Sequence, residues 1–92
     1  MKVKIFNGFD EYSKDMEFEE FAKTGFEYSC RAEYNIFNSM ISMIRTLRKS
    51  LEDDETIKSR LKEIYNISSW NIYMYEDRFE YLMNKAFNEL SL

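Results

Sequence analysis

The 92-residue sequence contains no histidine and no proline, and it has only two glycines and one cysteine. Histidine is the commonest metal ligand and the only side chain that titrates near neutral pH without perturbation. Its absence excludes the acid–base pairs, catalytic triads and zinc sites that depend on an imidazole. We therefore expect a protein that is not an enzyme and that has no metal site and no cofactor.

The single cysteine, Cys30, cannot form an internal disulfide, whereas small secreted domains usually carry several. The sequence also lacks a run of about 18 apolar residues, and its first residues lack the apolar stretch of a signal peptide. These absences predict a soluble, cytoplasmic protein with no membrane association and one domain over residues 1–92. The Cys30 thiol is expected to be a small buried group on the apolar side of a helix.

Aromatic residues make up 17% of the chain, and the formal net charge is −4. Acidic residues dominate residues 1–30 and 51–92, while residues 31–50 carry four basic residues, Arg31, Arg45, Arg48 and Lys49, against Glu33 alone. Nucleic-acid-binding proteins normally show a basic balance, because neutralising phosphates supplies most of their affinity. An acidic protein favours basic partners instead.

The first segment alternates polar and apolar residues over Lys2–Phe6 and reaches a turn signal at Asn7-Gly8, which predicts a short strand. Residues 9–25 fit two interpretations. Period-two spacing allows a second strand, and Ser13 as N-cap with Gly25 near the end allows a short helix. The helix is favoured, because the stretch from Phe18 to Lys23 has no β-branched residue.

Three further helices follow from the spacing of apolar residues. The longest spans about residues 27–51, with an inner face of Cys30, Tyr34, Phe37, Ile41, Ile44, Leu47 and Leu51. The next begins at the acidic triplet 53–55, taken as a capping sequence, and buries Ile57, Leu61, Ile64 and Tyr65. Ser68 or Ser69 caps the last helix. The inner face of this helix is Ile72, Tyr75, Phe79, Leu82, Ala86 and Leu90. The fold class is mainly α: a short N-terminal strand or hairpin followed by three to four helices in a small bundle.

The remaining large side chains and acids predict a partner-binding surface centred on the outer face of the last helix. Its residues are Glu17, Glu19, Glu20, Trp70, Tyr73, Glu76, Asp77, Glu80 and Tyr81. Carboxylates spaced along helices can occupy a basic groove that normally holds nucleic acid. The leading hypothesis is a non-enzymatic inhibitor or adaptor, encoded by a phage or mobile element, whose partner is a protein with a basic nucleic-acid-binding surface such as a CRISPR or restriction nuclease. The chain resembles small phage proteins that disable such nucleases in its size and acidity, without a shared motif.

Two other interpretations stay open. The spacing from Leu61 through Asn66 and Ser68 to Tyr75 also fits a helix-turn-helix, in which Arg31, Arg45, Arg48 and Lys49 would bind nucleic acid with Trp70 and Tyr73 stacking on bases. The bases near the end of the long helix are equally explained by its dipole. A homo-oligomer that closes over its aromatic residues and binds a small ligand at the interface is the third possibility.

A wider resemblance involves the strand at Lys2–Phe6, the sequence Cys30-Arg-Ala-Glu-Tyr-Asn35 and the sequence Leu61-Lys-Glu-Ile-Tyr-Asn-Ile-Ser-Ser69. In this order the segments resemble the amino-terminal region of the TnpB (OrfB) transposon-encoded, RNA-guided nucleases, over about residues 1–75. The basic residues and proline usual after the first strand of that family are replaced by Asn7-Gly-Phe-Asp10. Its catalytic domain has no counterpart in the chain, so the resemblance implies no active site.

Overall fold

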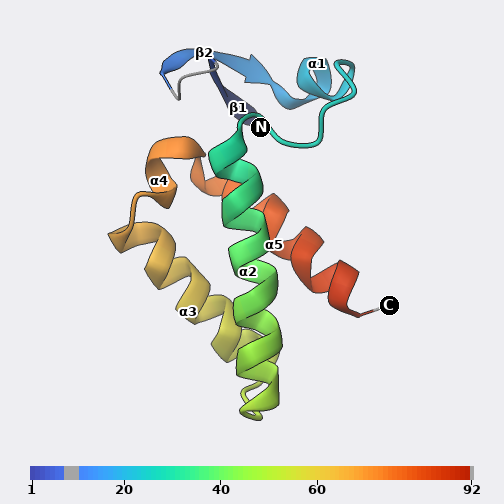
Figure 1. Ribbon diagram of the computed structural model, residues 1–92, viewed down its shortest axis with the longest axis vertical. Helices are drawn as coiled ribbons and strands as arrows, with labels where there is room; N and C mark the ends of the chain where they lie inside the picture. The colour runs from blue at the N-terminus through green and yellow to red at the C-terminus, as the bar shows by residue number, and fades with distance from the viewer. Residues whose placement is uncertain (8–10, 92) are drawn as a thin grey trace.

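A computed structural model of the chain describes residues 1–7 and 11–91, which form two strands followed by five helices (Figure 1). The elements in order are β1 (Lys2–Phe6), β2 (Tyr12–Glu17), α1 (Phe18–Ala22), α2 (Arg31–Lys49), α3 (Asp54–Ile67), α4 (Trp70–Tyr73) and α5 (Glu76–Leu90). The mainly helical class with an N-terminal hairpin is confirmed. The predicted turn at Asn7-Gly8 lies partly outside the described residues, which do not include Gly8.

The two strands form an antiparallel hairpin, and this corrects the preference for a helix from residue 9 onward. Opposite charges face each other across the pair, since Lys2 lies opposite Glu17 and Lys4 lies opposite Asp15. Such cross-strand pairs stabilise one register over the others. Only the part from Phe18 to Ala22 is helical, and Gly25 follows it with a positive φ of 81°, which a glycine adopts without strain.

Helix α2 is shorter than expected and is rotated relative to the predicted inner face. Cys30 is half-buried and serves as its N-cap, where the sulfur accepts a hydrogen bond from the Glu33 amide. Tyr34 is 49% exposed and Leu51, beyond the helix end, is 93% exposed, so both were wrongly placed in the inner face. The buried residues of α2 are Glu33, Ile36, Phe37, Met40 and Ile44.

Helix α3 agrees with its prediction. Asp53 is the N-cap and accepts a hydrogen bond from the Thr56 amide, so the acidic triplet does cap the helix. Ile57, Leu61 and Tyr65 are buried, and Ile64 is partly buried.

The last predicted helix is divided into two. Met74 and Tyr75 adopt extended backbone between α4 and α5, and Met74 is completely buried. The break exposes Ile72 and Tyr75, which were expected inside, while Phe79, Leu82 and Ala86 are buried as predicted. Met83 and Phe87 join them in the core.

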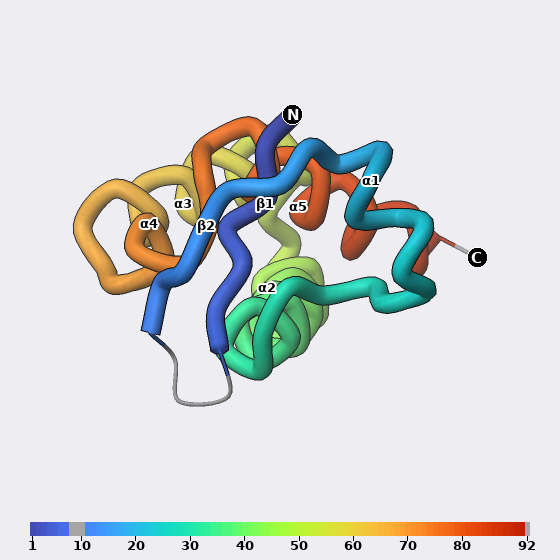
Figure 2. The backbone as a smooth tube through the Cα atoms, turned by 90° about the horizontal axis from the view of Figure 1, so that it is seen from above, coloured from blue at the N-terminus to red at the C-terminus, as the bar shows by residue number. Residues whose placement is uncertain are grey.

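The fold has two layers. The core cluster draws its residues from α2, α3, α5 and Met74, whereas β1, β2 and α1 form what we call the hairpin layer. This layer lies across the end of the helices where α2 begins (Figure 2). Val3 of β1 and Phe21 of α1 are the buried hydrophobic residues of this layer within the described chain, and both lie outside the core cluster. Within the described part of the chain, no helix has the length and apolar character needed to cross a membrane.

Candidate functional site: an acidic cleft between the hairpin layer and helix α5

A buried ion pair fixes the two helices that carry the site. Arg78, in the first turns of α5, lies 2.6 Å from the Glu33 carboxylate in the first turn of α2, and both side chains are completely buried. Glu33 also accepts hydrogen bonds from the amide and hydroxyl of Ser29, and Arg78 donates to the Glu27 carbonyl. Because a buried charge needs its partner, this pair sets the position of α5 against α2.

The hairpin layer reaches the helices mainly through side chains. The ring of Phe6 packs on Tyr73 with 5.4 Å between centroids, and Phe18 packs on Tyr81 at 5.0 Å. Lys4 donates to the carbonyl of Ile72 and lies 4.7 Å from the ring centroid of Tyr75. These contacts hold β2 opposite the beginning of α5.

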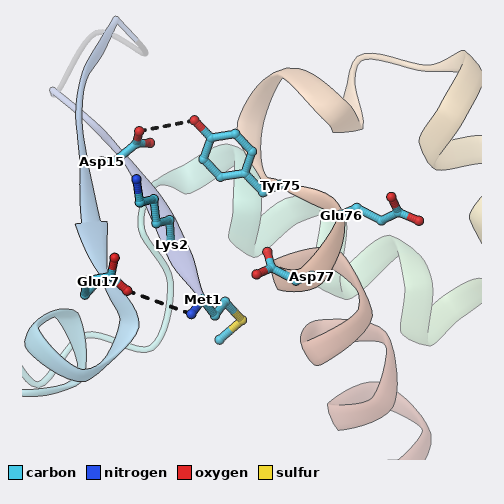
Figure 3. Close-up of a pocket in the computed structure, with 7 residues that line it drawn as sticks. All are labelled: Met1, Lys2, Asp15, Glu17, Tyr75, Glu76 and Asp77. Carbon is cyan, nitrogen blue, oxygen red and sulfur yellow. Dashed lines mark hydrogen bonds and ion pairs between the residues drawn. The ribbon is translucent and has the colours of Figure 1, made fainter.

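A cleft of about 610 Å³ lies between these two elements (Figure 3). Asp15 and Glu17 of β2 line one side, and Tyr75, Glu76 and Asp77 line the other. The Asp77 carboxylate points toward the hairpin, and Glu76 points away from it. Four acidic residues line the cleft, and three of them direct their carboxylates toward it or lie on its hairpin side. The positive groups of the lining are Lys2 and the amino group of Met1, which lies 3.8 Å from Glu17.

Asp15 is held across the cleft by tyrosine hydroxyls. Tyr75 donates a hydrogen bond to its carboxylate at 3.2 Å, and Figure 3 shows this contact bridging the two sides. Hydrogen bonding from Tyr12, together with Tyr75, Lys2 and Lys4, lowers the pKa of Asp15. The same contact with Asp15 raises the pKa of Tyr12. At neutral pH this side of the cleft keeps its negative charge.

Three of the six acids predicted as partner-binding residues line this cleft, and the other three do not. Glu17, Glu76 and Asp77 line it, and Glu20 lines an adjoining hollow with Asp15 and Glu17. Glu19 is exposed on the same short helix as Glu20. Glu80 lies 3.4 Å from Lys62 of α3 and is committed to that ion pair. We call Asp15, Glu17, Glu19, Glu20, Glu76 and Asp77 the acidic surface.

The aromatic residues expected on the outer face are placed differently. Trp70 and Tyr73 are partly buried and pack against the core, so the expectation of an exposed aromatic face on the last helix is wrong for both. Trp70 lies 6.2 Å from the ring of Phe79. Tyr81 alone of the three is exposed, at 41%.

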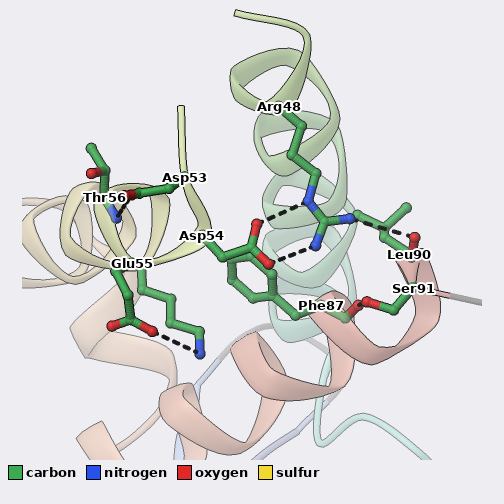
Figure 4. Close-up of polar contacts among 9 residues, drawn as sticks. Arg48, Asp53, Asp54, Glu55, Thr56, Phe87, Leu90 and Ser91 are labelled. Carbon is green, nitrogen blue, oxygen red and sulfur yellow. Dashed lines mark hydrogen bonds and ion pairs between the residues drawn. The ribbon is translucent and has the colours of Figure 1, made fainter. Parts of the chain in front are cut away.

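The basic residues of the alternative interpretation do not form one patch. Arg31 begins α2, and Arg45 and Lys49 are exposed near its other end, about 20 to 27 Å away at the helical rise per residue. Arg48 is engaged within the fold. It donates two hydrogen bonds to Asp54, at 3.1 and 3.0 Å, and one to the Leu90 carbonyl (Figure 4).

The Asp54 contact makes stability depend on pH. Hydrogen bonding from Arg48 holds the pKa of Asp54 below its ordinary value of about 3.9. Stability from this pair is therefore present above that pH and is lost as pH falls through the lowered pKa of the folded state. We expect Asp54→Asn to flatten the loss of stability below about pH 4, as measured by urea unfolding between pH 3 and 6. Glu63→Gln, at an exposed position of α3, is the control, and equal curves for the two variants would contradict the prediction.

Asp15 and Tyr75 were not among the site residues predicted from the sequence. The signal for Asp15 was present in the strand interpretation of residues 9–25, because period-two spacing places Asp15 and Glu17 on one face. Tyr75 was assigned to the inner face of a continuous helix, and only the break after α4 directs it to the cleft.

Among residues 1–7 and 11–91, no three cysteine, aspartate or glutamate side chains converge in a way that could hold a metal ion. Comparison of the chain with known protein families, with curated proteins and with solved structures found no match.

Proposed function

We propose that the chain is a non-enzymatic protein-binding module whose acidic surface binds the basic, nucleic-acid-binding surface of another protein. The observation that carries the proposal is the convergence of acidic residues from β2 and α5 on one cleft, with Glu20 of α1 in an adjoining hollow. β2 and α5 are distant in sequence, and the buried pair of Glu33 and Arg78 fixes α5 in place. Because they are preorganised, the charges can complement a basic surface with little loss of conformational entropy.

The partner class is a nucleic-acid-handling enzyme, of which restriction and CRISPR nucleases of a host cell are the leading candidates. Such enzymes hold nucleic acid in basic grooves, and a surface of carboxylates can compete for the same groove. A small acidic module with this property would act as an inhibitor encoded by a phage or mobile element.

A charge reversal tests the proposal. The variant Glu17→Lys/Glu76→Lys changes one acid on each side of the cleft, and Glu63→Lys/Glu89→Lys makes the same change in net charge at exposed positions of α3 and α5. We expect the cleft variant to bind a responsive nuclease about tenfold more weakly or worse, because like charges now face each other. The control variant should keep most of the affinity. Binding is measured by interferometry against a panel of purified restriction and CRISPR nucleases.

Competition with nucleic acid provides the second measurement. Duplex DNA or guide RNA should displace the module from its partner, and affinity should fall steeply with salt. Simultaneous binding of module and nucleic acid, or equal losses in the two charge variants, would contradict the proposal. A gel mobility shift of the chain with DNA or RNA at about 50 mM salt, abolished by Arg45→Ala/Lys49→Ala, would support the nucleic-acid-binding alternative instead.

A further inference from the structure

A second hollow adjoins the acidic surface on the other side of α1. Its walls are the aromatic rings of Phe18, Phe21, Phe26 and Tyr81, with Ala22 and Lys85 among the other lining residues. Phe26 is 71% exposed although it belongs to the wall, and Tyr81 is 41% exposed. Large rings left this open to water are typical of surfaces that bind a partner.

The volume of the hollow is about 280 Å³. A cavity of about 150 Å³ is sufficient to bind benzene, and sites for drug-sized ligands begin at about 300 Å³. The hollow is therefore large enough for one aromatic or branched aliphatic side chain and small for a cofactor. Single anchor residues seated in a pocket dominate the affinity of many protein interfaces.

The charges around the hollow select a neutral occupant. An aromatic cage often binds a cation, but the guanidinium carbon of Arg78 already lies 5.5 and 5.2 Å from the ring centroids of Phe18 and Tyr81. The charge of Arg78 is itself paired with Glu33. Lys85 and Glu27 both line the hollow and lie 3.7 Å apart, so this ion pair adds no net charge to the lining. A lysine or arginine side chain in the hollow would find the faces of Phe18 and Tyr81 already occupied by Arg78, and the acid of the lining, Glu27, already paired with Lys85.

The surroundings of the hollow are acidic. Glu19 and Glu20 are exposed on α1, the helix that also supplies Phe18 and Phe21 to the lining. Residues on either side of an inserted anchor would therefore lie close to carboxylates. Charge complementarity favours lysine and arginine at those flanking positions.

We infer that the hollow receives a neutral aromatic or aliphatic side chain from a segment of the partner in which basic residues flank this anchor. The inference rests on the proposed function and specifies the partner of the acidic surface. The carboxylates orient a basic segment, and the hollow selects those segments that carry an apolar residue in their middle.

The probe is the peptide acetyl-Arg-Lys-Phe-Lys-Arg-amide, titrated into the ¹⁵N-labelled full chain and followed by two-dimensional NMR. We expect saturable shifts of the Gly25 and Phe26 amides, and an affinity at least about tenfold higher than that of the same peptide with alanine in place of phenylalanine, a difference typical of one buried anchor. Peptides with a central lysine or with glutamate flanks should also bind more weakly. Equal affinity of the phenylalanine peptide and the alanine or lysine peptide would overturn the inference.

Two substitutions locate the binding. Phe26→Ala removes an exposed wall and should reduce peptide affinity about fivefold or more, while leaving the thermal unfolding temperature nearly unchanged because the ring is largely exposed. Ala22→Leu should reduce affinity by occupying the hollow. Ile67→Ala, at a 79% exposed position of α3, is the matched control and should have no effect. Unchanged affinity in Phe26→Ala would also overturn the inference.

The outcome is separable from that of the proposed function. One result would reject the anchor alone: nucleases bind the chain and respond to the charge reversal, yet Phe26→Ala and Ala22→Leu bind them as tightly as the wild type. The proposed role of the acidic surface would then be retained. If the peptide binds as expected while no nuclease binds, the hollow stands and the choice of partner is wrong.

Discussion

Replacing Arg78 with methionine is expected to lower the free energy of unfolding by about 3–5 kcal/mol, the range found when one partner of a buried ion pair is removed. The Glu33 carboxylate is completely buried, and without Arg78 it would keep only hydrogen bonds from Ser29. Arg78 also packs on the rings of Phe18, Phe21 and Tyr81, with 5.2–5.6 Å from its guanidinium carbon to their centroids. The substitution therefore loosens α1 as well as α5.

The double variant Glu33→Gln/Arg78→Met should recover a large part of this loss. A neutral amide oxygen at position 33 can still accept the hydrogen bond from the Ser29 amide, and no uncompensated charge remains buried. Urea unfolding of the wild type, both single variants and the double variant gives the coupling energy between the two residues. Additive effects, with the double variant as unstable as the sum of the single ones, would show that the pair is not the unit that holds α2 to α5.

Phe79→Ala is expected to lower the free energy of unfolding by about 3–5 kcal/mol, the usual cost of removing a buried phenylalanine ring. Phe79 is completely buried, and its ring stacks on Tyr65 at a centroid distance of 4.7 Å. Its removal would leave a cavity where α3, α4 and α5 meet, and Tyr65 and Trp70 would each lose a neighbour. Thermal and urea unfolding measure the effect.

Ile72→Ala is the control for Phe79→Ala. Both residues were expected on one inner face, but Ile72 is 56% exposed, so its truncation should cost far less. Comparable losses for the two variants would mean that the helix continues through Met74 and Tyr75 and that Ile72 is buried after all.

The sequence predicted the helices better than the hairpin, for a physical reason. The strand Tyr12–Glu17 is polar and mostly exposed, and it contains no β-branched residue, so it has little local preference for extended structure. It becomes a strand by pairing with β1, through the opposite charges of Lys2 with Glu17 and Lys4 with Asp15. Such pairing is a tertiary contact, which periodicity within one segment does not report.

The face of α2 was misplaced because one buried residue is charged. Glu33 was counted as a polar residue, so the predicted inner face passed through Tyr34, whereas the real one runs through Glu33, Ile36, Met40 and Ile44. The arginine that makes this burial possible lies 45 positions later in the sequence. The two side chains meet only when α5 packs on α2, so the spacing of residues within α2 could not identify Arg78 as the partner of Glu33.

The site was predicted in part. Glu17, Glu76 and Asp77 were chosen as acids and do share a cleft, yet they were attributed to the outer face of a helix together with Trp70 and Tyr73. The cleft depends on the hairpin register and on the break before α5, neither of which the apolar spacing indicated. Acidity alone therefore indicated Glu17, Glu76 and Asp77, but it also selected Glu80, which pairs with Lys62, and it did not select Asp15.

The acidic surface is shared between the two layers of the fold, so it is lost when the layers separate. Asp15 and Glu17 belong to the hairpin layer, and Glu76 and Asp77 belong to the helices, while Val3 and Phe21 are buried outside the core cluster. Partial opening that detaches the hairpin layer and keeps the helices packed needs less free energy than complete unfolding. Molecules in that state retain their helical content but have no cleft. The population of molecules that present the complete cleft is therefore set by this local equilibrium and not by global stability.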